Sequence, residues 1–327
     1  MDFIRAQLTR IPRITPVNLS ASTVLITGAN SGLGLAASRE VLMSSPKRLI
    51  LAVRNLDEGN KARSELMGRG KPTLTEIEVR KLDQNNFESV ASFAKSLKGD
   101  RVDFAILNAG VMNGEFITST DGLESELQIN VLSPALLSLL LLPNFHLASS
   151  SSKLPSTPPP HLTFVSSGLH TMAKFPERKL GPGEILPALN NRAQYSQSDR
   201  YSVTKTIGLL WMRELASRVQ SSDIVINAVN PGFCKTGLMR NTSGVMYYLS
   251  RVAQFLLGRE VADGARCLVD AAVIKGPETH GLYLSEMQVK AESDLVRSAE
   301  GKELEGRLWE EIVALLGQHG LDMENLP

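Results

Sequence analysis

The chain has 327 residues, of which 43% are hydrophobic and 21% are charged, as expected for a globular protein with a sizeable core. The formal net charge of +1 argues against a nucleic-acid-binding protein, because neutralising phosphates requires a concentrated positive face. The two cysteines, Cys234 and Cys267, are too few for a disulfide framework, so we expect a reducing, cytoplasmic location.

Neither the start of the chain nor its most apolar stretch is typical of a membrane or secreted protein. Residues 1–18 are mixed and polar and lack the apolar core of a signal peptide. Residues 131–142 are interrupted by Ser133, Pro134 and Ser138 and are too short to span a bilayer, which takes about 20 apolar residues. We therefore expect no transmembrane segment.

Short apolar runs alternate with helical stretches along the chain. The runs expected to form strands are residues 23–26, 49–53, 74–82, 103–107, 162–166, 224–229 and 281–284. The stretches expected to form helices are residues 34–43, 57–67, 86–97, 123–142 and 202–219. This alternation predicts an α/β fold with a doubly wound parallel sheet of about seven strands and helices on both faces. Ligands of such sheets bind at the carboxyl ends of the strands.

The motifs spread over most of the chain as one set, so we expect an extension at residues 1–20 and a single domain over residues 21–327. Two segments resemble insertions. Residues 149–160 are low in complexity and proline-rich, which predicts a mobile surface loop. Residues 174–200 have no clear period, and we interpret them as a lid or pocket wall.

A glycine-rich loop joins the first expected strand to the first expected helix. The segment TGANSGLG, residues 27–34, contains Gly28, Gly32 and Gly34. Glycines at such a junction allow a tight turn, a close approach of the backbone to a pyrophosphate, and close packing of the helix on the strand. The free amides and partial positive charge of the helix N-terminus would bind the phosphates. The alternative is a glycine-rich turn that binds no ligand.

The spacing of these glycines, with three residues between the first two, resembles that of the short-chain dehydrogenase/reductase family. Further segments that resemble motifs of this family follow in the expected order: Asn108-Ala109-Gly110, Asn130, Ser166-Ser167, Tyr201 with Lys205, and Asn230-Pro231-Gly232. The resemblance covers residues 22–236 closely, and the chain also resembles the retinol-dehydrogenase-like branch and related fungal reductases. It implies a Rossmann fold and hydride transfer between a nicotinamide dinucleotide and a carbonyl or alcohol carbon.

The residue that follows the second expected strand bears on the choice between NAD and NADP. An acidic residue there would hydrogen-bond the ribose diol of NAD and repel a 2′-phosphate. This chain has Arg54, whose guanidinium can grip that phosphate in a charge-assisted pair. We therefore expect NADP (as NADPH in reduction), the alternative being a solvated arginine without a ligand. The resemblance places Asp83 at the adenine, where the alternative is an acid that caps the next helix.

The residues expected to bind the cofactor come from the glycine loop, the ends of the strands and the catalytic helix. They are Gly28, Asn30, Ser31, Gly32, Leu33, Gly34, Arg54, Asp83, Asn108, Ala109, Gly110, Tyr201, Lys205, Pro231, Gly232 and Thr236. The last three resemble the family turn that packs on the nicotinamide carboxamide. Cys234 lies within this turn, and we expect a buried thiol rather than a reactive one.

Tyr201 and Lys205 lie four residues apart on an expected helix and therefore share one face. A free phenol has a pKa of about 10, which is too high for a good base at neutral pH. A lysine ammonium about 4 Å away would favour the phenolate by roughly 4 kcal/mol at an effective dielectric of about 20, or about three pKa units at most. Tyr201 would then donate a proton to a carbonyl or remove one from an alcohol. By resemblance, Lys205 would also hold the nicotinamide ribose hydroxyls.

The resemblance completes the catalytic set with Asn130 and Ser167. Ser167 would orient the substrate oxygen, with Ser166 as the alternative. Asn130 would support a water that relays protons to Lys205, or else it is a helix-kink residue. His170 follows Ser167 by three residues and would either line the pocket or lie in a surface loop.

Residues 237–257 correspond to the segment where the family varies its substrate lid. Their apolar side chains favour a hydrophobic small-molecule substrate, the alternative being a helix packed on the core. The apolar faces of residues 132–142 and 207–215 are too extensive for one sheet face, and relatives use these helices as a dimer interface, so we expect a homodimer. The five histidines show no ligand spacing, so no metal is expected.

The sequence thus predicts an NADP(H)-dependent oxidoreductase, and more narrowly a ketone reductase of specialised polyketide or terpenoid metabolism. Two alternatives keep the fold. One is an isomerase or cyclase that uses bound cofactor, and the other is a nucleotide-binding regulator without turnover. The complete set of Asn130, Ser167, Tyr201 and Lys205 argues against the regulator, because a binding protein needs no phenol with a tuned pKa.

Overall fold

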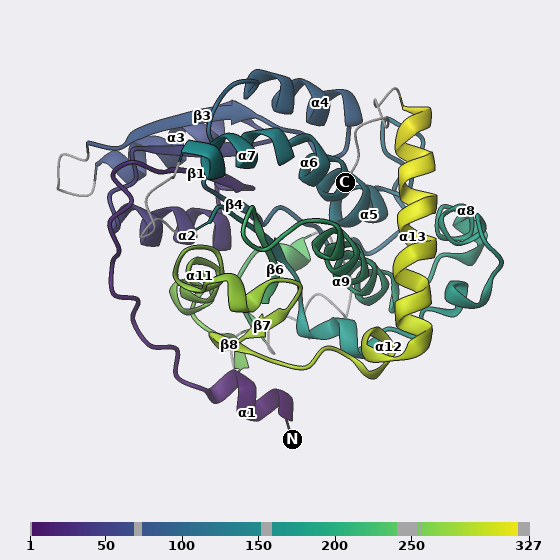
Figure 1. The fold of residues 1–327 in the computed structure, drawn as a ribbon. Coiled ribbons are helices and arrows are strands. Elements are labelled where there is room, and N and C mark those ends of the chain that lie inside the picture. Colours follow the sequence, from purple (N-terminus) through teal and green to yellow (C-terminus); the bar gives the residue numbers. More distant parts are fainter. Residues whose placement is uncertain (1, 69–73, 152–158, 241–253, 255–256, 320–327) are drawn as a thin grey trace.

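The computed structural model describes residues 2–68, 74–151, 159–240, 254 and 257–319 (Figure 1). A single sheet forms the centre of the molecule, with the strand order β3-β2-β1-β4-β5-β6-β7-β8. The strands are β1 (Thr23–Thr27), β2 (Arg48–Val53), β3 (Glu76–Lys81), β4 (Phe104–Leu107), β5 (His161–Val165), β6 (Val225–Asn230), β7 (Tyr283–Ser285) and β8 (Gln288–Val289).

The first seven strands pair in parallel, and β8 pairs antiparallel with β7. This arrangement confirms the predicted α/β fold with a doubly wound sheet. The prediction of about seven strands missed β8, because a two-residue strand leaves no apolar run to detect. The strand β3 lies at one edge of the sheet, which explains why its apolar residues alternate with polar ones.

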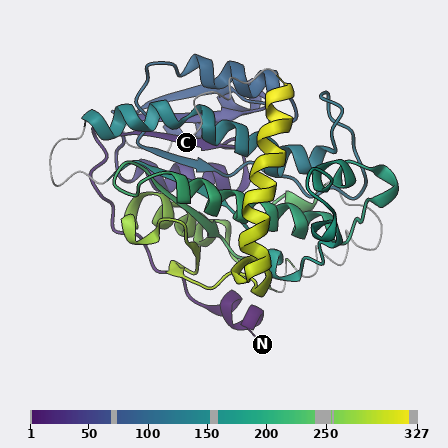
Figure 2. The same ribbon diagram turned by 45° about the vertical axis from the view of Figure 1, so that its right-hand side comes forward.

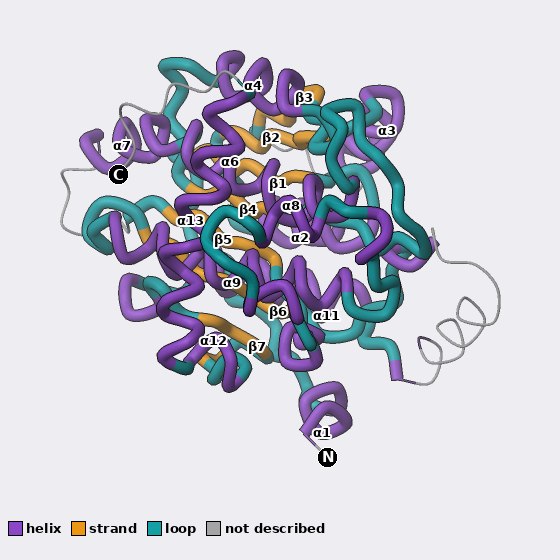
Figure 3. The backbone as a smooth tube through the Cα atoms, turned by 90° about the vertical axis from the view of Figure 1, so that its right-hand side faces the viewer, coloured by secondary structure: helices purple, strands orange, loops and turns teal. Residues whose placement is uncertain are grey.

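Helices cover both faces of the sheet (Figure 3). They are α1 (Asp2–Leu8), α2 (Gly32–Leu42), α3 (Leu56–Met67), α4 (Phe87–Ser96), α5 (Ser125–Leu127), α6 (Ser133–Leu140), α7 (Leu142–Ser151), α8 (Ile185–Leu189), α9 (Arg200–Arg218), α11 (Val261–Val269), α12 (Asp294–Arg297) and α13 (Ala299–Gln318). Apolar residues of α2, α3 and α11 form one core with one face of the sheet, and those of α4, α6, α9 and α13 form a second core with the other face.

The long helix predicted over residues 123–142 is broken in the structure. A π-helical turn, Gln128–Leu132, separates α5 from α6, and Pro134 stands in the first turn of α6. Proline has no N–H to donate, so a regular hydrogen-bond ladder cannot continue through this point. The helix α7 runs to Ser151, so the start of the predicted loop at residues 149–160 is helical, and residues 152–158 lie outside the described residues.

The C-terminal helix α13 covers the apolar face from which a homodimer was inferred. It lies against α9 (Figure 2), where Trp309 stacks on Trp211 with the ring centroids 4.6 Å apart. Ile207, Leu210 and Leu215 of α9 are therefore fully buried within the single chain. Most apolar residues of the other face, residues 132–142, are also buried in the same core, so neither face needs a partner chain to cover it. The homodimer stays an untested prediction.

Residues 174–200 also pack on α13 rather than forming a pocket wall. Backbone N–H groups of Gly183 and Leu186 each donate to the Glu311 carboxylate, at 2.9 Å in both cases. Phe175, Ile185 and Leu189 are fully buried in the same core as α13. The interpretation as a lid or pocket wall is wrong, because these apolar side chains face the core and, among the described residues, none of this segment lines the large cleft.

Among the helices that the structure describes, none is by itself both long and apolar enough to cross a bilayer. The bent pair made of residues 125–140 and 142–150 passes that test by length and composition alone.

Candidate active site

A cleft of about 1560 Å³ opens at the carboxyl ends of the parallel strands. Every residue predicted to bind the cofactor lines this cleft except Gly34, which packs beneath it. Tyr201, Lys205 and Ser167 lie in the same cleft, with Ser166 and His170 beside them. The fold therefore brings motifs separated by almost 200 residues in the chain into one site.

The glycine loop has the backbone geometry that the sequence predicted. Gly28 has φ +66° and Gly32 has φ +53°, a left-handed conformation that strains other residues. A Cβ atom on Gly34 would lie 2.4 Å from the Gly28 carbonyl oxygen, so α2 can begin this close to β1 only with glycine at that position. Ser31 is the N-cap of α2 and makes no side-chain capping bond. The Ser31 hydroxyl therefore does not cap α2, and it lies at the helix N-terminus where the phosphates of a dinucleotide would bind.

Asn108 and Ala109 bind the strand that precedes the glycine loop. The Asn108 side-chain amide donates to the Thr27 carbonyl at 2.9 Å, and the Ala109 N–H donates to the Thr27 hydroxyl at the same distance. These bonds fix the end of β4 against the end of β1. They also bring Ala109 so close to Gly28 that a Cβ on Gly28 would lie 3.1 Å from the Ala109 Cα.

Arg54 and Asp83 lie on the cleft wall at the ends of β2 and β3. Arg54 is exposed, and within the described residues its guanidinium forms no ion pair. One carboxylate oxygen of Asp83 accepts a hydrogen bond from the Asn85 N–H at 3.0 Å, whereas the N-cap of α4 is Asn86. Asp83 therefore shapes the turn before α4 and does not cap that helix.

The turn after β6 is held in place by the N-terminal helix α1, for which the sequence predicts no role. Gln7 donates to the Phe233 carbonyl at 2.7 Å, and the Phe233 N–H donates back to Gln7 at 3.1 Å. The buried guanidinium of Arg259 donates to Pro231 at 2.9 Å and to the Ala6 carbonyl at 2.8 Å. The N-terminal helix α1 is thus bonded to the turn that was predicted to meet the nicotinamide. No local pattern indicates this, because the partners lie more than 200 residues apart.

Within that turn, Gly232 has φ +83° and donates its N–H to Asn230 at 3.0 Å. Cys234 is buried, and burial raises the pKa of its thiol to about 12. A thiol that stays protonated is a poor nucleophile. The structure therefore favours the expected structural role of Cys234 in this turn. Of the predicted lid at residues 237–257, the described residues that line the cleft are Gly237, Leu238, Met239, Gln254 and Leu257. Residues 241–253 and 255–256 lie outside the described residues.

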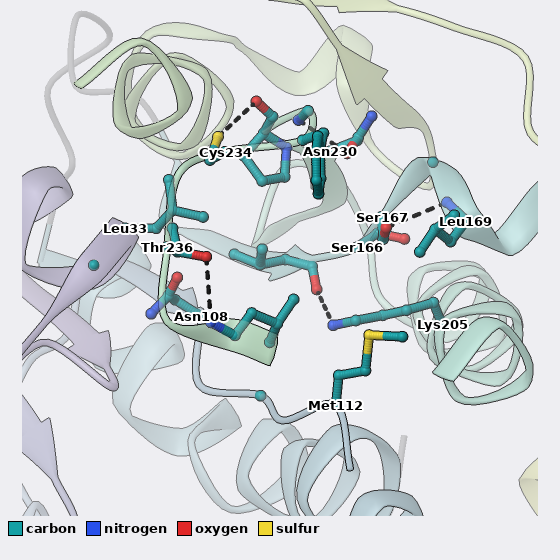
Figure 4. Close-up of a pocket in the computed structure, with 18 of the residues that line it drawn as sticks. Leu33, Asn108, Met112, Ser166, Ser167, Leu169, Lys205, Asn230, Cys234 and Thr236 are labelled. Atoms are coloured by element: carbon teal, nitrogen blue, oxygen red, sulfur yellow. Dashed lines mark hydrogen bonds between the residues drawn. The ribbon is translucent and has the colours of Figure 1, made fainter. Parts of the chain in front are cut away.

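Tyr201 and Lys205 point into the cleft from the first two turns of α9, and both are buried. The Lys205 ammonium donates to the Val165 carbonyl at 2.9 Å (Figure 4) and lies 5.6 Å from the centre of the Tyr201 ring. Burial lowers the pKa of Lys205 to about 8, and the Glu126 carboxyl opposes this shift.

The predicted lowering of the Tyr201 pKa by the lysine is not found. Burial raises the pKa of Tyr201 above its ordinary value, Glu126 raises it further, and the facing Ser167 hydroxyl lowers it. The helical spacing correctly put phenol and ammonium on one face. It could not show that both groups are buried and that Lys205 bonds to a carbonyl of β5.

The two serines after β5 differ in their surroundings. Ser167 accepts from the Leu169 N–H at 3.2 Å (Figure 4). Its hydroxyl also lies within hydrogen-bonding reach of the Tyr201 phenol. The Ser166 hydroxyl is buried and has no hydrogen-bond partner within the described residues. His170 is buried, donates from Nδ1 to the Ser167 carbonyl at 2.7 Å, and accepts at Nε2 from the Ser293 N–H at 3.0 Å. This pairing fixes the neutral tautomer of His170 and ties the Ser167 backbone to the loop before α12.

Asn130 lies in the π-helical turn, and its side chain is used by the protein. Its carbonyl accepts from the Val111 N–H at 2.9 Å, and its amide donates to the Val111 carbonyl at 2.8 Å and to Thr204 at 3.2 Å. The position of Asn130 in a π-helical turn agrees with the helix-kink alternative, and the water-relay role stays an untested prediction. The same region leaves little room at Gly110: a Cβ atom added there would lie 3.1 Å from the Asn130 side-chain oxygen and 3.7 Å from the Lys205 nitrogen.

Comparison with known proteins places this geometry in a family. The family model described as short chain dehydrogenase matches residues 22–153. The "Short chain dehydrogenase/reductase mfmJ" of Annulohypoxylon moriforme is 38% identical over 96% of this chain and 90% of its own. The "Short chain dehydrogenase/reductase dmxR8" of Cryptosporiopsis sp. is 34% identical over 97% of each chain.

The chain belongs to the short-chain dehydrogenase/reductase family. Among solved structures, an uncharacterised protein from Mycobacterium paratuberculosis is similar, with a TM-score of 0.67 and 25% identity over 92% of this chain and 96% of that one. A carbonyl reductase from chicken fatty liver shares the fold, with a TM-score of 0.59 and 19% identity over 85% of this chain and all of that one. The family is one of oxidoreductases, and the Rossmann fold predicted by resemblance is confirmed.

Proposed function

We propose that this short-chain dehydrogenase/reductase is an NADP(H)-dependent reductase that converts a ketone on a hydrophobic small molecule into a secondary alcohol. The geometry that carries the proposal is the meeting of Tyr201, Lys205 and Ser167 at the carboxyl end of β5, in the same cleft as the glycine loop. Bound NADPH would supply the hydride to the carbonyl carbon, and the oxidised cofactor would accept it in the reverse direction.

Arg54 supports the choice of NADP. Its side chain is exposed on the cleft wall at the end of β2, and no acidic residue of the described chain pairs with it. A guanidinium in this state is free to form charge-assisted hydrogen bonds with a 2′-phosphate. The absence of an acid at this position also removes the group that would select the NAD ribose.

The electrostatics of Tyr201 support reduction as the working direction. A phenol whose pKa is raised keeps its proton at neutral pH and can donate it to the oxygen of a ketone as the hydride arrives at carbon. Ser167 faces this phenol and would hydrogen-bond the same oxygen. Lys205, with its pKa lowered to about 8, exchanges protons near neutral pH and would help to reprotonate Tyr201.

The wall of the cleft supports a hydrophobic substrate. Beyond the cofactor motifs it is lined by Met112, Leu169, Met172, Leu238 and Met239. We extend the proposal to specialised metabolism and a cytoplasmic location, both of which rest on the sequence arguments above. Asn130 would support a water that relays protons to Lys205, and its two bonds to Val111 would hold the neighbouring backbone in place.

The test is consumption of NADPH with a panel of ketones of increasing apolar size. We compare wild type with Tyr201→Phe and with a matched control, Tyr195→Phe, which removes a hydroxyl from a tyrosine that does not line the cleft in the described structure. We expect consumption by wild type and the control, and a loss of about 10³-fold in Tyr201→Phe. Equal rates in wild type and Tyr201→Phe would refute the proposal. Conversion of substrate without net consumption of NADPH would instead indicate the isomerase or cyclase.

A further inference from the structure

His170 is a buried histidine, 2% exposed, that bonds directly to the serine proposed to orient the substrate oxygen. It belongs to the 3₁₀-helical turn Gly168–Met172, and Ser167 is the N-cap of that turn. Nδ1 of the His170 ring lies 2.7 Å from the Ser167 carbonyl oxygen, and the His170 backbone N–H donates to the same oxygen at 3.2 Å. One residue therefore bonds this carbonyl twice, and the shorter of the two bonds comes from its side chain.

The second partner of the ring decides which nitrogen carries the proton. The backbone N–H of Ser293 lies 3.0 Å from Nε2 of His170. A backbone N–H can only donate, so Nε2 accepts, and the proton of the neutral ring is on Nδ1. Burial lowers the pKa of His170, which keeps the ring neutral. The Ser293 N–H thus holds the ring in the tautomer that can donate to Ser167.

The surroundings of the ring are themselves fixed. In the loop before α12, the Glu292 carboxylate forms an ion pair with Arg213 of α9 at 2.9 Å. The Tyr283 ring packs edge-on against His170, with the ring centroids 5.0 Å apart. The Thr206 hydroxyl on α9 donates to the His170 carbonyl at 3.3 Å. His170 therefore joins the end of β5 to the catalytic helix and to the loop before α12.

The place of the Ser167 hydroxyl depends on the main chain that carries it, because a serine side chain has only one heavy-atom torsion. This hydroxyl accepts from the Leu169 N–H at 3.2 Å (Figure 4), which leaves its own proton for the oxygen of a ketone. A shift of about 1 Å in a positioned group can cost about 100-fold in rate. The bond from His170 restrains such a shift at the residue where it matters for the reaction.

We propose that His170 is a positioning residue for ketone reduction: its Nδ1–H fixes the main chain of Ser167, and the Ser293 N–H keeps the ring in the tautomer that this bond requires. His170 acts through Ser167 and needs no contact of its own with the substrate. The inference rests on the proposed function. It adds a residue, and a long-range backbone bond, to which the family motifs give no role.

The test is the rate of hydride transfer from NADPH to an accepted ketone in a single turnover, measured in wild type, His170→Asn and His170→Gln. An asparagine amide can place an N–H near the position of Nδ1, and it needs no partner to select a tautomer. A glutamine amide reaches the position of Nε2 and leaves the Ser167 carbonyl without its shorter bond. We expect His170→Asn to stay within about threefold of the wild-type rate and His170→Gln to be slower by about tenfold. Affinity for NADPH should be the same in all three proteins.

A second pair of variants tests the Ser293 N–H. Ser293 has φ −59°, which proline adopts, and its side chain caps α12 by accepting from the Val296 N–H at 3.3 Å. Ser293→Ala removes the cap alone, whereas Ser293→Pro removes the cap and also the N–H that bonds to His170. We expect hydride transfer about threefold slower in the proline variant than in the alanine variant, because the ring can then lose its proton from Nδ1 to Nε2. Circular dichroism identifies any variant that does not fold.

A His170→Gln variant at least as fast as His170→Asn would overturn the inference, because a structural role alone does not distinguish the two ring nitrogens. Equal rates in Ser293→Pro and Ser293→Ala would overturn it as well. These outcomes are distinct from failure of the proposed function. If Tyr201→Phe reduces ketones at the wild-type rate, the proposed function fails whatever the His170 variants do. If Tyr201→Phe is inactive and the two His170 variants react alike, only the present inference fails.

Discussion

At the end of the cleft proposed to bind the dinucleotide the shape of the site is set by the main chain. At the end proposed to be catalytic it is set by buried side chains from separate parts of the fold. Gly28, Gly32 and Gly34 act through backbone angles and the room left by a missing Cβ. Tyr201 and Lys205 act through burial and through charges on other elements. The shape of the first end follows from a short stretch of sequence, the glycine loop. The properties of the second end depend on contacts between residues that are far apart in the sequence.

The largest expected effect on cofactor binding is at the main-chain end. Gly34→Ala places a Cβ 2.4 Å from the Gly28 carbonyl oxygen and 2.7 Å from the Asn108 amide, so the loop must move. We expect affinity for NADPH to fall by at least about 100-fold, as measured by fluorescence titration, because backbone amides in this loop would bind the phosphates.

The matched control is Gly306→Ala in α13, where a Cβ would meet no atom within 4 Å. It should bind NADPH like wild type. If Gly34→Ala binds NADPH as tightly as this control, the main chain does not set the shape of that end.

The second effect separates the two adjacent serines of the catalytic end. Ser167→Ala removes the hydroxyl that faces Tyr201 and should lower kcat by about 100-fold while affinity for NADPH is kept. Ser166→Ala removes a buried hydroxyl that has no partner among the described residues, so it should lower kcat by less than about threefold. Steady-state kinetics of the two variants measure both values of kcat. A larger loss of kcat in Ser166→Ala than in Ser167→Ala would instead assign the catalytic hydroxyl to Ser166.

The third effect concerns selectivity between the dinucleotides. Arg54→Ala should weaken NADP binding by about tenfold, which corresponds to about 1.4 kcal/mol for one charge-assisted contact at an exposed site. Binding of NAD should stay within about twofold, because that ligand lacks the 2′-phosphate. Calorimetric titration with both dinucleotides measures the two constants, and an equal loss for both would contradict the assignment of Arg54.

The smallest effect tests whether the N-terminal helix belongs to the site. Gln7→Ala removes both hydrogen bonds to the Phe233 backbone and should raise KM for NADPH by about threefold, since each bond contributes about 1 kcal/mol or less at a partly exposed position. Arg10→Ala, an exposed change in the same segment, is the control and should leave KM unchanged. Identical KM values in the two variants would mean that α1 does not support the turn.

This comparison also explains how far the sequence could predict the structure. The glycine loop, the strands β1, β2 and β4, and the pairing of Tyr201 with Lys205 on one helix face follow from short periods and local spacing, and the structure has them. Spacing within α9 fixes which side chains share a face, whatever packs against that face.

The features that sequence reasoning missed depend on long-range packing. The sequence predicts a subunit interface on the apolar face of α9, because no local pattern shows that Trp309 of the C-terminal helix α13 covers Trp211. The shift in the pKa of Tyr201 has the opposite sign to the predicted one, because burial and Glu126 raise this pKa and neither can be inferred from the spacing of Tyr201 and Lys205. The bond between Gln7 and Phe233 joins partners that no local motif connects.

The most direct test of the whole account is a single turnover of bound NADPH with an accepted ketone, followed in wild type and Tyr201→Phe alongside their affinities for NADPH. We expect equal affinity and hydride transfer slower by about 10³-fold in the variant, because the phenol donates a proton and does not shape the dinucleotide end. Hydride transfer at the wild-type rate in Tyr201→Phe would contradict it.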